Sequence, residues 1–254
     1  MSNSLIMVLN SKFRTADSNS SSDFTISIGQ SISIKQMVIQ SVSLPNTVYN
    51  ITAENNVTSL EYNLNTYNIT IPIGQYNLAG FIIALQAQLT TIDIGSVVSQ
   101  NPLTQKLQFT FSLPSRFVCD SFNPLSKVIG VFIFNQQFYP TVASASFTAS
   151  ALPDLSGTRN FYICSRTLGQ GTNSILQSGE NLPLLLNLQN TAGFGDLNYW
   201  QNNETRLSLK SYKQYQNAQF IDIQIRDIDG VIVDLNGADW GMTMLIYYEL
   251  VFKD

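Results

Sequence analysis

The sequence predicts an all-β protein whose antiparallel strands form a sandwich or a barrel. Apolar and polar residues alternate strictly in many short runs, such as Phe24–Ile28, Tyr67–Ile71 and Leu107–Phe111. Alternation with a period of two places one face of a strand in a core and the other toward water or a second surface. Turn-forming Asn, Gly, Pro and Ser separate these runs. Many short strands with turns between them are typical of sandwiches and barrels.

The same pattern places the individual strands in chain order. We expect strands at Phe24–Ile28, Ile32–Ile34, Met37–Leu44, Tyr67–Ile71, Leu107–Phe111, Leu207–Leu209, Phe220–Ile225 and Met242–Phe252. The segment before Asp23 has two interpretations. It is either an arm that reaches a neighbouring molecule, or a first strand at Leu5–Leu9 followed by a floppy, Ser-rich turn.

One segment departs from the β pattern and predicts a helix. Its apolar residues recur at helical spacing: Leu78, Phe81, Ile82, Leu85 and Leu89. Asn77 is a suitable N-cap, so we expect one short amphipathic helix over about residues 77–90. A second short helix is predicted from Pro124 to Ile129, ending at Gly130.

The remaining segments predict long surface loops. Residues 136–157 are rich in Ala, Ser and Thr and show no clear period, and residues 168–205 contain two glycine-bearing stretches. Long loops in compact folds are often functional surfaces. No linker separates two domains, and 254 residues are enough for one large all-β core. We therefore expect a single domain over residues 1–254, with loop or insertion regions at 136–157 and 168–205.

Charged residues make up 12% of the chain, about half of the usual share of about 25%. A surface of Asn, Gln, Ser and Thr repels copies of itself only weakly, which suits self-association. A β-rich protein whose exposed strand faces prefer Thr and Ser explains the composition equally well. The net charge is −4 and the Lys and Arg residues are scattered, so we expect no direct nucleic-acid binding.

The chain offers no clear membrane or redox signal. The apolar run Leu5–Leu9 is too short for a membrane span, and no basic segment precedes it as in a signal peptide. We expect no membrane span and a non-secretory compartment. Cys119 and Cys164 lie in apolar segments without metal-ligand spacing, which predicts buried free thiols.

Catalytic chemistry finds little support in the sequence. The chain has no histidine, which removes the commonest general base and metal ligand. Asp227, Asp229 and Asp234 lack the later ligands of a calcium-binding loop. Asp229-Gly230 is better explained as a turn between apolar runs, and Asn236-Gly237 likewise. We expect no enzyme, no cofactor and no metal.

Tyr199 and Trp200 form the candidate binding site. They lie in a segment rich in Gly, Asn and Gln, where exposed aromatic rings could contact a receptor or glycan. The alternative is that these large aromatic side chains anchor the loop to the core.

From about Lys35 to the C-terminus, the chain resembles the penton-type capsid proteins of virophages and polinton-like viruses, which are single jelly rolls. The resemblance lies in an ordered series of short sequence motifs, here called phrases. The phrases are Leu44–Ile51, Ile73–Tyr76 with the helix that follows, Lys106–Phe111, Val128–Val131, Asn160–Ser165, and Ile221–Asp227 with Gly230, Asp234-Leu235, Gly237 and Trp240.

The resemblance implies an antiparallel jelly-roll β-sandwich, and it leaves open a small inserted upper region. It also implies a structural protein of the virion that forms the pentameric penton at icosahedral five-fold vertices. Its partners would be copies of itself and the major capsid protein, after synthesis in the host cytoplasm. The alternatives are a trimeric minor capsid or cement protein and a glycan- or receptor-binding module of a virion.

Overall fold

The computed structural model describes residues 3–120, 123–132, 136–168, 174–175, 181–203 and 208–250. The chain divides into two compact units. Unit 1 consists of Met1–Val48 and Thr158–Asp254, and unit 2 consists of Tyr49–Gly157. Unit 2 is therefore inserted into the sequence of unit 1.

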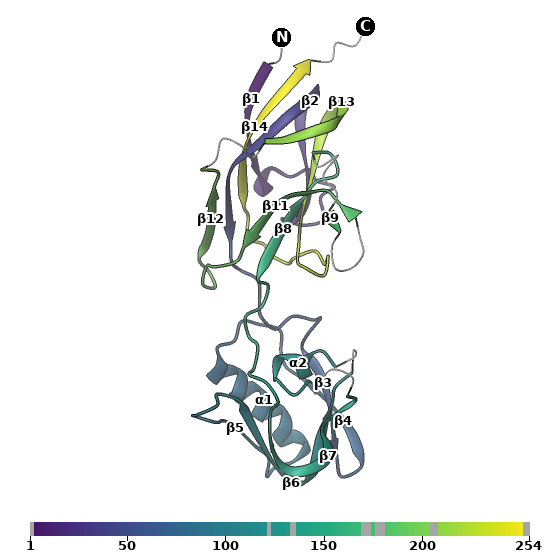
Figure 1. Ribbon diagram of the computed structural model, residues 1–254, viewed down its shortest axis with the longest axis vertical. Coiled ribbons are helices and arrows are strands. Elements are labelled where there is room, and N and C mark those ends of the chain that lie inside the picture. Colours follow the sequence, from purple (N-terminus) through teal and green to yellow (C-terminus); the bar gives the residue numbers. More distant parts are fainter. Residues whose placement is uncertain are drawn as a thin grey trace. The chain divides into compact units, whose positions relative to one another are not determined.

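Unit 1 is built almost wholly of antiparallel strands (Figure 1). Its described elements are β1 (Asn3–Asn10), the 3₁₀ helix η1 (Ser11–Phe13), β2 (Asp23–Pro45), β8 (Asn160–Cys164), β9 (Ser174–Ile175), β10 (Asn181–Leu182), β11 (Leu184–Gln189), β12 (Leu197–Gln201), β13 (Ser208–Arg226) and β14 (Gly241–Leu250). The main sheet has the order β1-β14-β2-β13-β8-β11, and β12 also pairs with β2.

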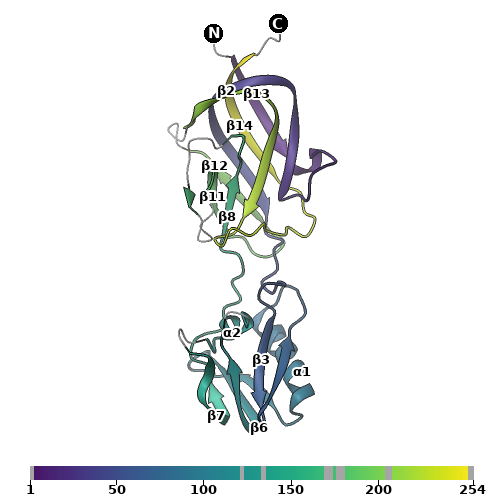
Figure 2. The same cartoon turned by 90° about the vertical axis from the view of Figure 1, so that its right-hand side faces the viewer.

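The two longest strands of unit 1, β2 and β13, let this sheet enclose one core. Their mutual register shifts at three places between Lys210 and Phe220, and Figure 2 shows both strands strongly curved. Such irregularities bend a strand and increase its twist. Inward-facing residues from both ends of the sheet consequently meet in one cluster, as Met244 of β14 and Phe161 of β8 do.

Unit 2 combines an antiparallel sheet with the longer helix. Its described elements are β3 (Val57–Tyr62), β4 (Asn65–Thr70), α1 (Leu78–Ile92), β5 (Val97–Gln100), β6 (Leu107–Val118), α2 (Leu125–Val128) and β7 (Phe138–Thr148). The strand order is β4-β3-β6-β5, with β7 also paired to β6. Phe81, Leu85 and Leu89 of α1 are fully buried in a core that includes Phe109 and Phe117 of β6.

In each unit, an asparagine side chain holds together the two points where the chain passes to the other unit. In unit 1, Asn190 Nδ2 donates to Asn46 Oδ1 at 3.2 Å and to the Thr158 carbonyl at 2.8 Å. In unit 2, Asn50 Nδ2 donates to the Leu155 carbonyl at 3.0 Å. Gly157 lies against Asn50, because a Cβ at this glycine would approach the Asn50 Cα to 3.3 Å. The chain therefore leaves and re-enters unit 1 at neighbouring points.

Both helix predictions are confirmed. The Asn77 side chain caps α1 by accepting a hydrogen bond from the Gly80 amide, and α1 extends two residues beyond the expected end. The second helix is the short α2, which Gly130 follows with a φ of 76°. Among the described residues no helix is both long enough and apolar enough to cross a membrane.

Three expectations about organisation differ from the structure. The division into two units replaces the single domain over 1–254, and the inserted region is the whole of 49–157. The loop prediction for 136–157 is wrong over Phe138–Thr148, which form β7. Among the described strands β7 pairs only with β6, and its residues are half-buried or exposed, so it does not need an apolar period. Within 168–205, β9, β10, β11 and β12 are strands, and residues 169–173, 176–180 and 204–205 lie outside the described residues.

Candidate interaction surface

The two aromatic residues of the candidate binding site lie on opposite faces of a strand. Tyr199 and Trp200 belong to β12, which pairs with β2, so the prediction that they lie in a loop is wrong. Trp200 lies opposite the buried Val42 and packs against the core of unit 1. Tyr199 is 61% exposed. Trp200 therefore anchors the strand, and only Tyr199 presents a free ring.

Tyr199 belongs to a larger surface, which we call the β1–β12 face. It is the outer face of the four neighbouring strands β1, β14, β2 and β12. Directly opposite residues of an antiparallel pair point to the same side of a sheet. One row across the face is Ile6, Leu245 and Val38, and another is Val8, Thr243, Ser41 and Gln201. A third row is Asn10, Gly241, Ser43 and Tyr199, followed by Pro45 beside Leu197.

The β1–β12 face is apolar at positions where water would normally favour polar residues. Ile6 is 63% exposed, Val8 69% and Leu197 55%. None of the residues in the rows named above is charged. The large exposed side chains lie on the two flanks, Ile6 and Val8 on β1 and Leu197 and Tyr199 on β12, with polar residues such as Ser41 between them. Exposed apolar side chains grouped in this way mark each flank as a candidate contact with another molecule.

Ion pairs lie beyond both ends of this face. Lys35 and Glu249 are 3.0 Å apart near the N-terminal end of β1. Arg14 and Asp239 are 3.1 Å apart where β1 has ended and β14 has not yet begun. The uncharged face thus lies between charged ends, and the core of a protein–protein interface is likewise depleted of charged residues.

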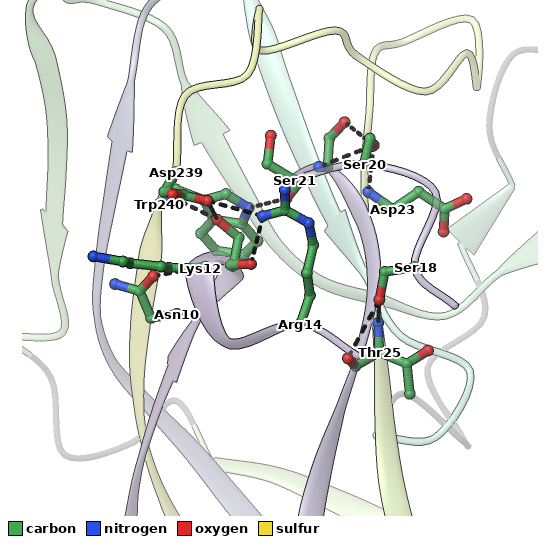
Figure 3. A network of polar contacts seen from close by, with 12 residues as sticks. Asn10, Lys12, Arg14, Ser18, Ser20, Ser21, Asp23, Thr25, Asp239 and Trp240 are labelled. Carbon is green, nitrogen blue, oxygen red and sulfur yellow. Dashed lines mark hydrogen bonds and ion pairs between the residues drawn. The ribbon is translucent and has the colours of Figure 1, made fainter. Parts of the chain in front are cut away.

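A polar network fixes the end of β1 (Figure 3). Ser11 Oγ donates to the Asp239 carboxylate at 2.8 Å and accepts from the Trp240 amide at 3.0 Å. The Trp240 indole donates to the Ser21 carbonyl at 2.7 Å, and Arg14 donates to both Ser11 and Asp239. The network holds the segment after β1 against the start of β14.

The structure decides between the two interpretations of the N-terminal segment. Residues Asn3–Asn10 form the first strand, so this part of the chain is not an extended arm. The Ser-rich turn is well bonded and not floppy, because Ser20 Oγ accepts from the amides of Ser22 and Asp23. Ser21 and Ser22 are buried. β1 thus has a fixed position at the edge of the sheet.

Two predicted turns are confirmed. Gly230 has a φ of 84°, and the Asp227 carboxylate accepts hydrogen bonds from the amides of Asp229 and Val231. The carboxylate that stabilises this turn is thus Asp227 and not Asp229. Asn236 and Gly237 both have positive φ, and the Ala238 amide closes the second turn onto the Leu235 carbonyl. The Asp227 carboxylate therefore stabilises the turn through these hydrogen bonds.

Both cysteines are buried free thiols, as the sequence predicted. Burial raises the pKa of the Cys119 thiol to about 12, with the charge of Asp120 adding to the effect. Burial raises the pKa of Cys164 to about 11, and the charge of Arg226 opposes it. Because the thiolate is the reactive form, both residues are inert in the folded protein. Cys164 belongs to unit 1 and Cys119 to unit 2.

The sequence of β1 carries a signal for the β1–β12 face. Leu5–Leu9 is an uninterrupted apolar run, whereas a strand with one solvated face alternates. In a strand such a run makes both faces apolar, which is how Ile6 and Val8 come to be exposed. In the described part of the chain, no group of three or more His, Cys, Asp or Glu residues is arranged to hold a metal ion.

This fold is shared, along nearly the whole length of the chain, with a solved structure. The crystal structure of the selenomethionine-labelled mavirus penton protein matches with a TM-score of 0.54 and 11% sequence identity. The match covers 97% of this chain and 100% of the other. The all-β, antiparallel jelly-roll prediction is confirmed, with the longer helix in unit 2. No protein-family model and no curated protein sequence matches the chain.

Proposed function

We propose that this protein is a viral capsid protein that forms the pentameric penton at the five-fold vertices of an icosahedral virion. The observation that carries the proposal is the fold shared with the mavirus penton protein over 97% of this chain and all of the other. The resemblance of the sequence phrases to penton-type capsid proteins points the same way. Its partners would be further copies of itself and the major capsid protein.

The physical character of the chain supports a role in assembly. Only 12% of its residues are charged, and the exposed β1–β12 face carries large apolar side chains. A closed ring needs a heterologous contact in which two different surfaces of one chain meet. The proposed role is geometric and not enzymatic, and it places the protein in the virion after synthesis in the host cytoplasm.

The mass of the purified protein in solution tests this function. Mass photometry across a concentration series, with and without the major capsid protein, should show a species of five 28.2 kDa subunits, about 141 kDa. A trimer would move the assignment to a minor capsid or cement protein. A monomer under every condition, including with the major capsid protein, would overturn the penton assignment.

A second candidate function is receptor or glycan contact through Tyr199. The exposure of its ring favours this role, while Trp200 is partly buried against the core. Glycan-array binding that is lost in Tyr199→Ala and kept in Tyr199→Phe would support a stacking contact. An array without signal for the wild-type protein would remove the candidate.

A further inference from the structure

β1 is an unprotected edge strand. Among the described strands it pairs only with β14, in a register without shifts over all eight residues. Natural edge strands are usually shielded by Lys, Pro, bulges or a very short length. Asn3–Asn10 contains no Lys, Pro or Gly. The opposite edge strand, β11, is bulged between Leu184 and Leu186 and follows Pro183. Of these two edges, β1 is the one left open to a further strand.

β12 forms a second edge on the other flank of the same face. Among the described strands it pairs only with β2. β1 is antiparallel to β14, β14 to β2, and β2 to β12. β1 and β12 therefore run in opposite directions along the two flanks of the β1–β12 face. The apolar side chains lie beside these edges, with Ile6 and Val8 on β1, and Leu197 and Tyr199 on β12.

We infer that the β1 flank of one copy docks, head to tail, against the β12 flank of a second copy of this chain. The inference rests on the proposed ring assembly and names the surface that builds it. Copies in a ring share one orientation about its axis. The β1 edge of one copy then runs antiparallel to the β12 edge of the next, which is the direction that hydrogen-bonded pairing needs.

The side chains beside the two edges complete this contact. Neighbouring copies in a closed ring are rotated against each other, so residues next to the two edges converge on one side of the joint. Ile6 and Val8 of one copy then meet Leu197 and Tyr199 of the next. All four are uncharged, so neither half of the contact opposes the approach of the other.

The size of the face agrees with a specific interface. β1, β14 and β2 each contribute about eight residues and β12 contributes five. With about 4.8 Å between strands and about 3.3 Å per residue, the flat area is roughly 450 Å². A standard interface buries about 800 Å² on each partner. Edge pairing buries the two flanks of this face and the backbone of both edges, which form the central part of such an interface.

A second copy is the occupant that these observations favour. A partner for β1 must offer an open, uncharged strand edge of opposite direction with apolar side chains beside it, and β12 of the same chain offers all of these. An unrelated partner would leave the β12 flank exposed. Head-to-tail use of the two flanks covers both in every copy of a closed ring.

Introducing carboxylates on either flank tests the inference. The double variant Ile6→Glu/Val8→Glu and the double variant Leu197→Glu/Tyr199→Glu place carboxylates in the proposed contact, where they would be buried without partners. Each should raise the concentration needed for half-assembly by about 100-fold or more in mass photometry, because a carboxylate buried without a partner is strongly unfavourable. Ile83→Glu is the matched control, since Ile83 is 71% exposed on α1 of unit 2, and assembly of this variant should be unchanged.

Folding is checked in the same samples. The four substituted side chains are all exposed, so Cys164 should stay protected from thiol labelling in each variant. A Val8→Lys/Tyr199→Glu double variant should recover assembly relative to Tyr199→Glu alone, since the two new charges attract across the contact.

The outcomes separate this inference from the proposed function. Rings that form as in the wild type in both Glu double variants would overturn the contact while the ring function stands. Loss of assembly in the β1 variant alone would indicate a two-fold β1–β1 contact and overturn the head-to-tail arrangement. A wild-type protein that stays monomeric even with the major capsid protein would overturn the penton function itself, and the contact with it.

Discussion

The two units of this protein are built from the chain in different ways. Unit 2 is one continuous stretch, Tyr49–Gly157, with a sheet and the longer helix around a core rich in phenylalanine. Unit 1 is made from two segments, and β2 from the first segment pairs with β12, β13 and β14 from the second. Unit 2 therefore has its strands, its helices and its core within one segment, whereas neither segment of unit 1 can complete its sheet alone.

This difference explains which parts of the chain are linked by buried polar hydrogen bonds in each unit. In unit 1 the network of Ser11, Asp239 and Trp240 joins residues more than two hundred positions apart. In unit 2 the Asn50 side chain, at the start of the segment, bonds to Leu155 near its end and also to Tyr76. Buried polar groups of this kind specify one arrangement because leaving any of them unpaired is costly. Cys164 and Cys119 report on the two units separately.

The largest expected effect comes from separating the units. A polypeptide of residues 49–157 should fold alone, with Cys119 protected, because all partners of its core lie within it. Residues 158–254 alone should remain unfolded, since β2 and β1 are missing from their sheet. Circular dichroism and thiol labelling measure both outcomes. Replacing 49–157 by a short Gly-Ser linker should leave unit 1 folded, because Asn190 holds Asn46 and Thr158 close together. Failure of this linker protein to fold would show that the units depend on each other.

The next effect is expected from Trp240→Ala in unit 1. Trp240 is 3% exposed, packs edge-to-face on Phe24 with ring centroids 5.8 Å apart, and donates to the Ser21 carbonyl. Truncating a buried tryptophan typically costs about 3–5 kcal/mol of unfolding free energy. Urea titration with labelling of Cys164 measures the loss. Trp240→Phe is the control and should lose less, because it keeps most of the ring.

Labelling of Cys119 distinguishes local from global effects of Trp240→Ala. If the units unfold separately, the Cys119 transition stays at the wild-type urea concentration. A shift of both thiols by the same amount would mean that the two units unfold as one.

Asn50→Leu is the corresponding change in unit 2 and should have a somewhat smaller effect. The Asn50 side chain donates to the carbonyls of Tyr76 and Leu155 and accepts from the Tyr76 amide. Leucine leaves these three backbone groups without their partner, at about 1 kcal/mol each, or about 3 kcal/mol in total. The Cys119 transition in urea reports the loss. Asn50→Asp would place a buried carboxylate against the Tyr76 and Leu155 carbonyls, so it should be at least as destabilising as Asn50→Leu. A wild-type midpoint in Asn50→Asp would contradict this account.

Sequence patterns predicted those features of the fold that depend on local residues. Helix α1 was found from its spacing and its cap at Asn77, and the turns at Gly230 and Asn236-Gly237 from their φ requirements. β7 was missed because its middle, Thr141–Ser146, consists mostly of small and polar residues that are exposed or half-buried and show no period, although Tyr139 and Phe147 pack against the core. The two-unit division was missed because the chain passes between the units without a linker of distinct composition.

The candidate surface was only partly predictable, because strand pairing between distant parts of the chain assembles it. Tyr199 was singled out from its residue type, and its exposure depends on which face β12 turns to the core. The partners of Tyr199 on the β1–β12 face, such as Ile6 and Val8, lie at the other end of the chain. Only the pairing of β1, β14, β2 and β12 brings them together, and such long-range register is not encoded in any local pattern.

The smallest effect is a dependence of unit 2 on acid. Asp93 is the only charged residue between Glu61 and Lys106, and it is buried at the end of α1. Burial alone raises the pKa of its carboxyl group, but hydrogen bonds from Ser112, Gly95 and Tyr62 outweigh this and hold the pKa below its ordinary value. The folded state therefore favours the carboxylate more than the unfolded state does.

The sign of the pH effect follows from this lowered pKa. The stabilisation by Asp93 is fully present above the pKa of the unfolded chain, near 4, and is lost as the pH falls through the lower pKa of the folded state. The urea midpoint for Cys119 exposure should thus decrease below about pH 4. Asp93→Asn should lower the midpoint at neutral pH and flatten this dependence. The Cys164 transition should not change with this substitution, and a wild-type acid dependence that persists unchanged in Asp93→Asn would assign the effect to other carboxyl groups.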